Sequence, residues 1–335
     1  MSEITMEQDP NSLPIQDEKP RIAGHGKPVS TQLDFLRRMI TQPKAVIGLV
    51  IMAFFILIAI FAPLIAPYNP SKYVALPHQP PSAQYWLGTT GQGQDVFSQL
   101  VWGSRISLMI GFGVGILSTL VGLVIGMISG YLPGLVDGLL NMFTNVFLLI
   151  PGLPLLIALA SFLPQGMVTV MLVLTFTGWA WPARVFRSQV LSLREKDFVS
   201  ASVVSGEGVS RIVFAEILPN MLSLVISSLF GAVIYTIGAD AGLAFLGFEN
   251  VNIVSWGTML YWASNSSALL QEAWWTFLPP GLCIALVSFA TTMLIYAMDE
   301  VTNPRLRSKK EITRVLRKYH IGSQRSPPVV KPVKS

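Results

Sequence analysis

Residues 106–130 read ISLMIGFGVGILSTLVGLVIGMISG, a run of 25 residues without a single charged side chain. A helix needs about 20 predominantly apolar residues to cross the hydrocarbon core of a bilayer. The absence of cations extends further, because no Lys or Arg occurs from 106 to 183 or from 212 to 304. A soluble protein of this length could not cover its surface with such stretches. The run therefore predicts a membrane-spanning helix.

The rest of the chain repeats this pattern. Of its 335 residues, 52% are hydrophobic and only 12% are charged, against roughly 25% charged in ordinary soluble domains. Six apolar segments are each long enough to span a bilayer: 45–66, 106–130, 135–163, 167–186, 221–248 and 277–298. We therefore predict an all-α, polytopic membrane protein with six transmembrane helices.

The segments between and around these spans divide the chain. Residues 1–44 form a polar N-terminal tail, in which 33–40 predict a short interfacial helix. The first apolar run starts too late for a cleaved signal peptide. After the first transmembrane helix (45–66), residues 67–105 form an extracytoplasmic loop, 106–304 a five-helix core with a long loop at 187–220, and 305–335 a basic tail.

The basic residues predict the orientation. They gather before the first span, between the fourth and fifth spans, and after the sixth. With six spans, all three places fall on one side, and the positive-inside rule makes that side cytoplasmic. We therefore expect a cell-membrane protein, in a bacterium or archaeon, with both termini in the cytoplasm.

Several small features exclude other classes. The single cysteine, Cys283, allows no disulfide within the chain, and the three histidines are too far apart to form a zinc site. No P-loop sequence and no catalytic constellation is present. The cations border apolar segments, so the net charge of +5 does not indicate nucleic acid. We expect neither an enzyme nor a metal, nucleic-acid or cofactor site in this chain.

Two sets of intramembrane residues indicate contacts. Gly122, Gly126 and Gly130 repeat every four residues and so form one face on which another helix of this chain can approach closely. Four tryptophans between the last two spans are typical of interfacial anchors: Trp256, Trp262, Trp274 and Trp275.

The long loop at 184–220 reads RVFRSQVLSLREKDFVSASVVSGEGVSRIVFAEILPN. One apolar face (Phe198, Ala201, Val204 and Ser205) precedes Gly206, and a second apolar pattern follows it. Two short amphipathic helices that meet at a glycine would form a compact knob, suited to a groove on a partner protein.

This loop resembles the cytoplasmic motif of ABC importer permeases, which reads EAA, then Gly, then I-x-L-P. Ser200, Ala201 and Ser202 stand at the EAA position, with Ser200 in place of the acidic residue. Gly206 matches the central glycine, and the sequence Ile217, Leu218, Pro219 closes the motif. The resemblance implies that these seven residues couple the chain to an ATPase.

Four further segments resemble the dipeptide/oligopeptide/nickel branch of that family. They are WLGTTGQGQDVFSQLVWGSRISL (86–108), DAGLAFLGF (240–248) with its following SWG, AWWTFLPPGL (273–282) and DEVTNPRLR (299–307). Membership implies a homologous second permease, two ABC ATPase subunits that carry ATP and Mg, an extracytoplasmic solute-binding protein, and contact with membrane lipid. The transported solute would be an oligopeptide or dipeptide.

Three polar residues are candidates for the translocation pathway. Asp240 is an acid deep within a predicted span, where such residues usually face a cavity or a partner group. Asn141 and Asn145 continue a polar face that begins at Asp137, and this face either lines the path or bonds to a neighbouring helix.

Two alternatives stay open at this stage. The weakly charged face at Asn145 fits oligosaccharides, which some members of this branch import, as well as peptides. A secondary transporter or a channel is the alternative of a different class. A secondary transporter would favour an internal repeat and several intramembrane charges, and the sequence shows neither.

Overall fold

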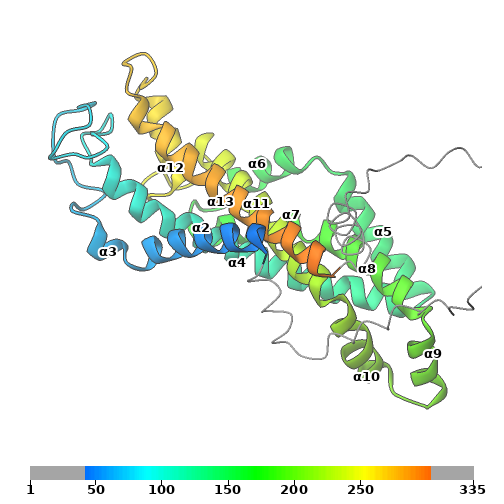
Figure 1. The fold of residues 1–335 in the computed structure, drawn as a ribbon. Helices are drawn as coiled ribbons and strands as arrows, with labels where there is room; N and C mark the ends of the chain where they lie inside the picture. Colours follow the sequence, from blue (N-terminus) through cyan, green and yellow to red (C-terminus); the bar gives the residue numbers. More distant parts are fainter. Residues whose placement is uncertain (1–41, 303–335) are drawn as a thin grey trace, which may run out of the picture.

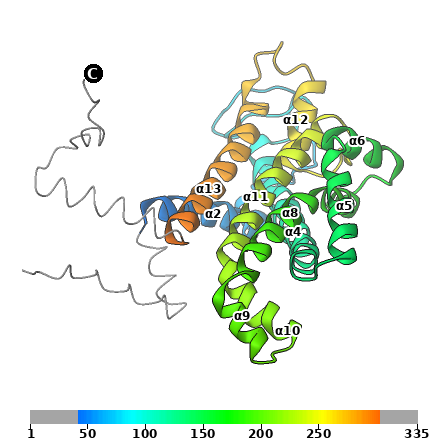
Figure 2. The ribbon, with the colours of Figure 1, turned by 90° about the vertical axis from the view of Figure 1, so that its right-hand side faces the viewer.

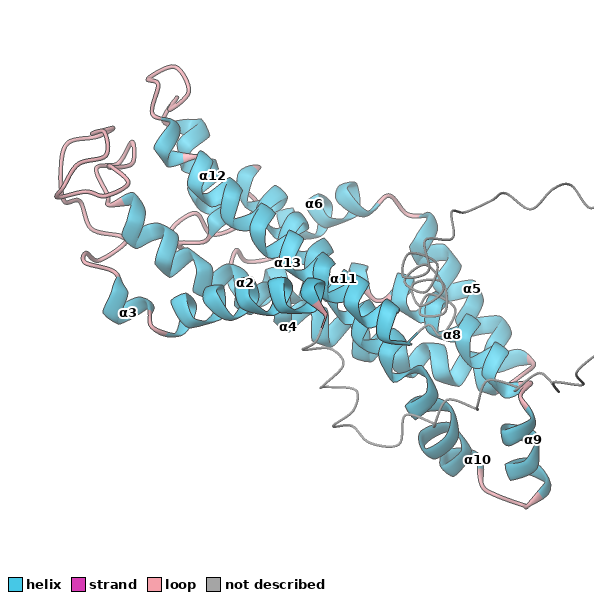
Figure 3. Cartoon of the chain, in the orientation of Figure 1, coloured by secondary structure: helices cyan, strands magenta, loops and turns pink. Residues whose placement is uncertain are grey.

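The computed structural model describes residues 42–302, and its regular structure there is helical, with one isolated antiparallel bridge between Thr89 and Asp95 (Figure 3). The predicted interfacial helix at 33–40 and the basic tail at 305–335 lie outside the described residues. The elements are α2 (Pro43–Ile60), α3 (Ala62–Ile65), α4 (Val96–Tyr131), α5 (Leu135–Leu149), α6 (Gly152–Phe162), α7 (Met167–Gly178), α8 (Ala180–Arg194), α9 (Asp197–Val204), α10 (Val209–Arg211), the π-helical η1 (Ile212–Ile217), α11 (Leu218–Phe245), α12 (Trp256–Asn265), the 3₁₀ turn η2 (Trp274–Thr276) and α13 (Leu278–Thr302).

Five helical segments of the described chain are long and apolar enough to cross a membrane. They are Pro43–Ile60, Val96–Tyr131, Met167–Arg194, Val209–Phe245 and Trp274–Glu300. The pair α5–α6 makes a sixth if its two halves count as one span. The prediction of an all-α polytopic membrane protein is therefore confirmed.

The third span differs from the single continuous helix expected at 135–163. Its two halves, α5 and α6, are bent by 88° at the break between them. Ile150 adopts an extended conformation, as residues before proline do, and Pro151 cannot continue the helical hydrogen bonding. This span is consequently a broken or re-entrant one.

The second span also differs, because α4 begins at Val96, ten residues before the predicted start at 106. The buried Asp95 side chain caps the helix: its Oδ2 accepts hydrogen bonds from Ser98 N at 2.8 Å and Ser98 Oγ at 2.6 Å. A side chain that satisfies an N-terminal amide is a strong start signal. The expected extracytoplasmic loop therefore loses residues 96–105 to the helix.

The glycine row in α4 is a helix-packing face within this chain, as predicted. A methyl group placed on Gly126 would lie 2.7 Å from Phe186 Cβ and 2.8 Å from the carbonyl oxygen of Ala183, both in α8. Gly122 and Gly130 approach α8 equally closely. The absence of side chains on this face lets the α4 and α8 backbones touch.

The prediction that all four tryptophans are interfacial anchors is wrong for two of them. Trp256 is fully buried, and its indole N–H donates to Leu100 O at 3.1 Å. Trp275 is also buried, and its indole N–H donates to Thr89 O at 3.1 Å. Both rings therefore fasten the segment between α11 and α13 to α4 and the loop before it.

The elements form an elongated bundle with two distinct ends (Figures 1 and 2). The loop before α4, together with α12 and the loop after it, lies at one end. The α9–α10 segment projects from the other end in both views. The helix α11 runs from the second end towards the first, so the two ends share one continuous element.

Candidate coupling site

The projecting tip is built from α9, α10 and η1, which together cover the predicted knob. Gly206 has a φ of +76° and turns the chain between α9 and α10. That conformation is open to glycine at little cost and strained for most other residues. The predicted bend at Gly206 is therefore present, but the second half differs from a separate short helix, because α10 passes through η1 directly into α11.

The π-turn η1 has a local cause in the closing Ile-Leu-Pro of the motif. Pro219 lies within the first turn of α11 and has no N–H to donate to the carbonyl four residues earlier. Its ring also crowds that carbonyl, and a wider turn relieves the crowding. Ile217, Leu218 and Pro219 thus mark the joint between the tip and the long helix.

The inner face of the tip packs on the bundle. Val199 of α9 is buried together with Ile212, Val213 and Ile217 of η1. The same apolar cluster includes residues of three long helices: Leu123 and Met127 of α4, Phe186, Val190 and Leu193 of α8, and Met221 of α11. A close-packed cluster transmits displacement rather than absorbing it. A push on the tip would consequently reach α4, α8 and α11.

The outer face of the tip is apolar and uncovered. Val204, at the end of α9, is 89% exposed. Four more large apolar side chains of the tip are exposed: Phe198, Val203, Val209 and Phe214. Among the motif residues, Ser200, Ala201, Gly206 and Pro219 are exposed, Ser202 and Leu218 are half-buried, and Ile217 is buried. Several exposed apolar side chains gathered on a projecting segment are typical of an interaction site.

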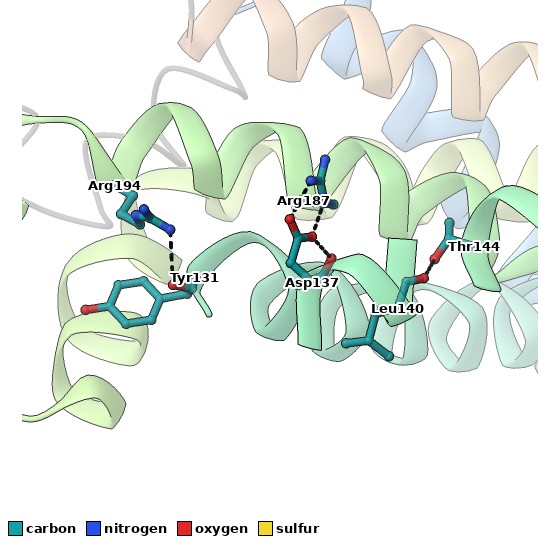
Figure 4. A network of polar contacts seen from close by, with 7 residues as sticks. Tyr131, Asp137, Leu140, Thr144, Arg187 and Arg194 are labelled. Carbon is teal, nitrogen blue, oxygen red and sulfur yellow. Dashed lines mark hydrogen bonds and ion pairs between the residues drawn. The ribbon is translucent and has the colours of Figure 1, made fainter. Parts of the chain in front are cut away.

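An ion pair fixes α8, which leads into the tip, to the start of α5 (Figure 4). Arg187 donates to both carboxylate oxygens of Asp137, from Nε at 2.7 Å and from Nη2 at 2.8 Å. Ser129 Oγ of α4 donates to the same carboxylate at 2.7 Å. Such a two-pronged, half-buried pair has a fixed geometry. It ties α4, α5 and α8 together close to the tip.

The polar face of α5 makes interhelical contacts, one of the two readings left open by the sequence. Arg184 Nη2 donates to Asn145 Oδ1 at 2.5 Å, one turn of α8 before the Arg187 contact. Asn141 lies between Asp137 and Asn145 on the same face and is half-buried. The structure therefore joins Asp137 and Asn145 to α8.

Asp240, the third pathway candidate, lies elsewhere. It is 1% exposed near the end of α11 that is remote from the tip. Its neighbour is Glu249, a fully buried acid in the turn after α11 that the sequence reasoning missed. The sequence does contain a signal that Glu249 is unusual, because it directly follows the apolar stretch 243–248. Charged groups are rarely buried unless they are paired.

These observations define a class: a helical membrane protein with a close-packed bundle and a tip that projects from one end and carries exposed apolar side chains. The sequence comparisons give the family. Residues 122–308 match the family described as binding-protein-dependent transport system inner membrane component. Residues 31–81 match the family described as N-terminal TM domain of oligopeptide transport permease C.

Curated relatives agree with these family matches. The oligopeptide transport system permease protein OppC of Bacillus subtilis is 33% identical over 284 residues, which cover 84% of this chain and 92% of the relative. The dipeptide transport system permease protein DppC of Alkalihalophilus pseudofirmus is 33% identical over 316 residues, 90% of this chain and 97% of the relative. A putative peptide permease protein of Brucella suis is 30% identical over 295 residues, 87% and 97% of the two chains. The chain belongs to the family of binding-protein-dependent transport system inner membrane components, the permeases of ABC importers.

Proposed function

We propose that this chain is the permease subunit through which an ATP-driven importer moves peptides delivered by an extracytoplasmic binding protein. The exposed apolar tip around Val204 carries the proposal, because a subunit of such an importer must receive the motion of an ATPase. The names of the relatives, oligopeptide and dipeptide permeases, support the peptide substrate. A homologous second permease and two ATPase subunits complete the assembly.

The coupling mechanism follows from the packing of the tip. When the ATPase pair closes on ATP, the motif residues of the tip move with it, and Leu218 and Pro219 carry the motion into α11. The apolar cluster behind Val199 passes this displacement to α8 and α11. Because α11 continues to the remote end of the bundle, a rigid tilt of this helix alters both ends together. Access to the pathway then alternates between the two sides.

The proposed orientation places the tip and both termini in the cytoplasm. It is tested with a thiol reagent that does not cross membranes, after replacing Cys283 with Ala. The exposed Ser82→Cys should react in intact cells, and Ser202→Cys only after permeabilisation. Labelling of Ser202→Cys in intact cells contradicts the orientation.

The pathway role of Asn141, Asn145 and Asp240 is part of this proposal. The amide nitrogen of Asn145 is not used in its contact with Arg184, and Asn141 lies one turn away on the same face of α5. Both amides can hydrogen-bond to a peptide backbone. Asp240 would reach the solute only when the remote end opens, because it is buried in this conformation.

Transport is tested in cells that lack this chain and are complemented with the wild-type gene. Uptake of labelled tripeptides to pentapeptides should depend on the chain and should stop when ATP is depleted. If oligosaccharide uptake is lost instead while peptide uptake persists, the substrate assignment is wrong. If uptake survives ATP depletion but collapses with a protonophore, the chain acts as a secondary transporter.

A further inference from the structure

Two buried acids at the remote end of α11 have no partner among residues 42–302 that would neutralise them. Asp240 and Glu249 are 1% and 0% exposed, and they interact electrostatically. Asp240 Oδ1 and both carboxylate oxygens of Glu249 are buried without a hydrogen bond among the described residues. A buried polar atom without a partner is costly, and a buried unpaired charge far more so.

Thr236 lies one turn before Asp240 on the same face of α11 and adds a third buried polar group. Several Thr and Ser hydroxyls within the helices of this bundle donate to the carbonyl four residues earlier, as Thr144 does to Leu140 and Thr291 to Val287. The buried Thr236 hydroxyl makes no such bond in the described structure. Its oxygen therefore lies one helical turn from Asp240, without a hydrogen-bond partner among the described residues.

The elements packed against this end of α11 place no Lys or Arg where it would neutralise the two acids. Residues 106–131 of α4 contain no charged side chain, nor do α6 and α7, and α12 contributes Tyr261 alone. Arg105 of α4 is exposed and lies over the Trp102 ring at 5.6 Å.

The other elements packed against α11 carry charged residues, but these lie near the tip half of α11 or bind other groups. Glu216 of η1 and Arg211 of α10 lie at the tip. On α13, which also carries Cys283 and Tyr296, Asp299 accepts from Ser227 at 3.5 Å. Ser227 is 13 residues before Asp240, or ~20 Å along the helix. The α8 arginines bind α5 and the Tyr131 carbonyl.

The helix itself favours a neutral pair. Asp240 lies near the C-terminus of α11 and Glu249 just beyond it. The free carbonyls there give this end a partial negative charge, which repels a carboxylate. Two ionised acids beside it would add their mutual repulsion in a low-dielectric site. Burial alone raises the pKa of Glu249 to about 7.

We infer that Asp240, Glu249 and the Thr236 hydroxyl form a proton-binding site, in which the two carboxyls hold one proton between them while this end of the bundle is closed. The proton neutralises one carboxyl and so removes the repulsion between the two acids, while the unpartnered Thr236 hydroxyl lies one helical turn from Asp240. When the end opens and water enters, the pair ionises and the proton leaves. This inference does not depend on which solute is transported.

The sign of the pH effect follows from linkage. A carboxyl whose pKa is raised on folding contributes to the stability of the folded protein when the pH is below its pKa in the unfolded chain. For Glu249 this contribution is complete below pH 4.5 and is lost as the pH rises through about 7. The Tm of the full-length chain, purified with the companion permease, should therefore fall across this window. Glu249→Gln, which keeps the shape of the protonated acid, should remove this component. Glu272→Gln, the same change at an exposed acid, should leave it intact.

Infrared spectroscopy gives a second, independent readout. Wild-type protein at neutral pH should show the carbonyl stretch of one protonated carboxylic acid, and Glu249→Gln should lose it. The inference is overturned if this band is absent from the wild type. It is also overturned if Na⁺, compared with choline at equal ionic strength, raises the wild-type Tm and Glu249→Gln abolishes that rise, because a metal ion would then occupy the site.

Discussion

Replacing Gly126 with alanine tests the packing that fixes α8, and with it the tip, to the bundle. The new Cβ would lie 2.7 Å from Phe186 Cβ, whereas carbon atoms pack best at about 3.5–4.0 Å. The second close atom is the Ala183 carbonyl oxygen at 2.8 Å. Both atoms are fixed to the backbone, so no rotamer change relieves the clash. The two helices must separate by roughly 1 Å.

The cost of that separation in the free energy of unfolding can be estimated. Gaps of 0.5–1 Å forfeit about a quarter to a half of the dispersion energy of each contact along the interface. Overpacking of this kind typically costs about 1–3 kcal/mol, partly offset by the helix propensity that alanine gains over glycine, up to ~1 kcal/mol. We therefore expect Gly126→Ala to lower the free energy of unfolding by about 1–2 kcal/mol.

The assay is unfolding of the purified chain by SDS in mixed micelles, followed by circular dichroism and tryptophan fluorescence. The matched control is Gly231→Ala inside α11, where an added Cβ meets nothing within 4 Å. The control should leave stability unchanged or raise it by up to ~1 kcal/mol. If Gly126→Ala is as stable as Gly231→Ala, the close approach of α4 and α8 is refuted.

Two further predictions concern the same region. In a double-mutant cycle, Asp137→Asn and Arg187→Gln should each destabilise the chain, with a coupling energy of about 1–2 kcal/mol by SDS unfolding, because the pair is two-pronged and half-buried. Additive effects would show that the pair does not clamp α5 to α8. Gly206→Val should cost at least about 1–2 kcal/mol locally, because its φ of +76° suits a β-branched residue poorly, and should lower ATPase co-purification. Gly208→Ala, at a φ of −69°, should have no effect. If the two variants behave alike, the left-handed conformation at Gly206 is not required for ATPase binding.

The spans and the α4 glycine face could be predicted because they depend on local composition and period. A run of 25 uncharged, mostly apolar residues predicts a spanning helix whatever its neighbours are. Glycines at intervals of four lie on one side of such a helix. The break in the third span was also readable from Pro151, but the apolar composition on both sides outweighed it. Element boundaries depend on caps such as Asp95, whose effect needs the neighbouring amide in place.

The missed features depend on contacts between distant segments. The burial of Trp256 requires α4 to supply the Leu100 carbonyl, 156 residues earlier, and no local pattern reveals that contact. The partners of Asp137 and Asn145 are likewise separated from them by 50 and 39 residues. Glu249 reads as a loop acid in the sequence and becomes unusual only because the fold buries it beside Asp240.

The central claim is that the apolar tip around Val204 receives the ATPase, and ATP hydrolysis by the reconstituted importer tests it most directly. The complete complex in liposomes, with the companion permease, both ATPases and loaded binding protein, should lose most of its stimulated hydrolysis when Val204 is changed to Asp. ATPase co-purification should weaken in parallel. Leu270→Asp, an equally exposed apolar position (85%, against 89% for Val204) at the opposite end, should retain its ATPases. Unchanged assembly and stimulation in Val204→Asp would contradict the account.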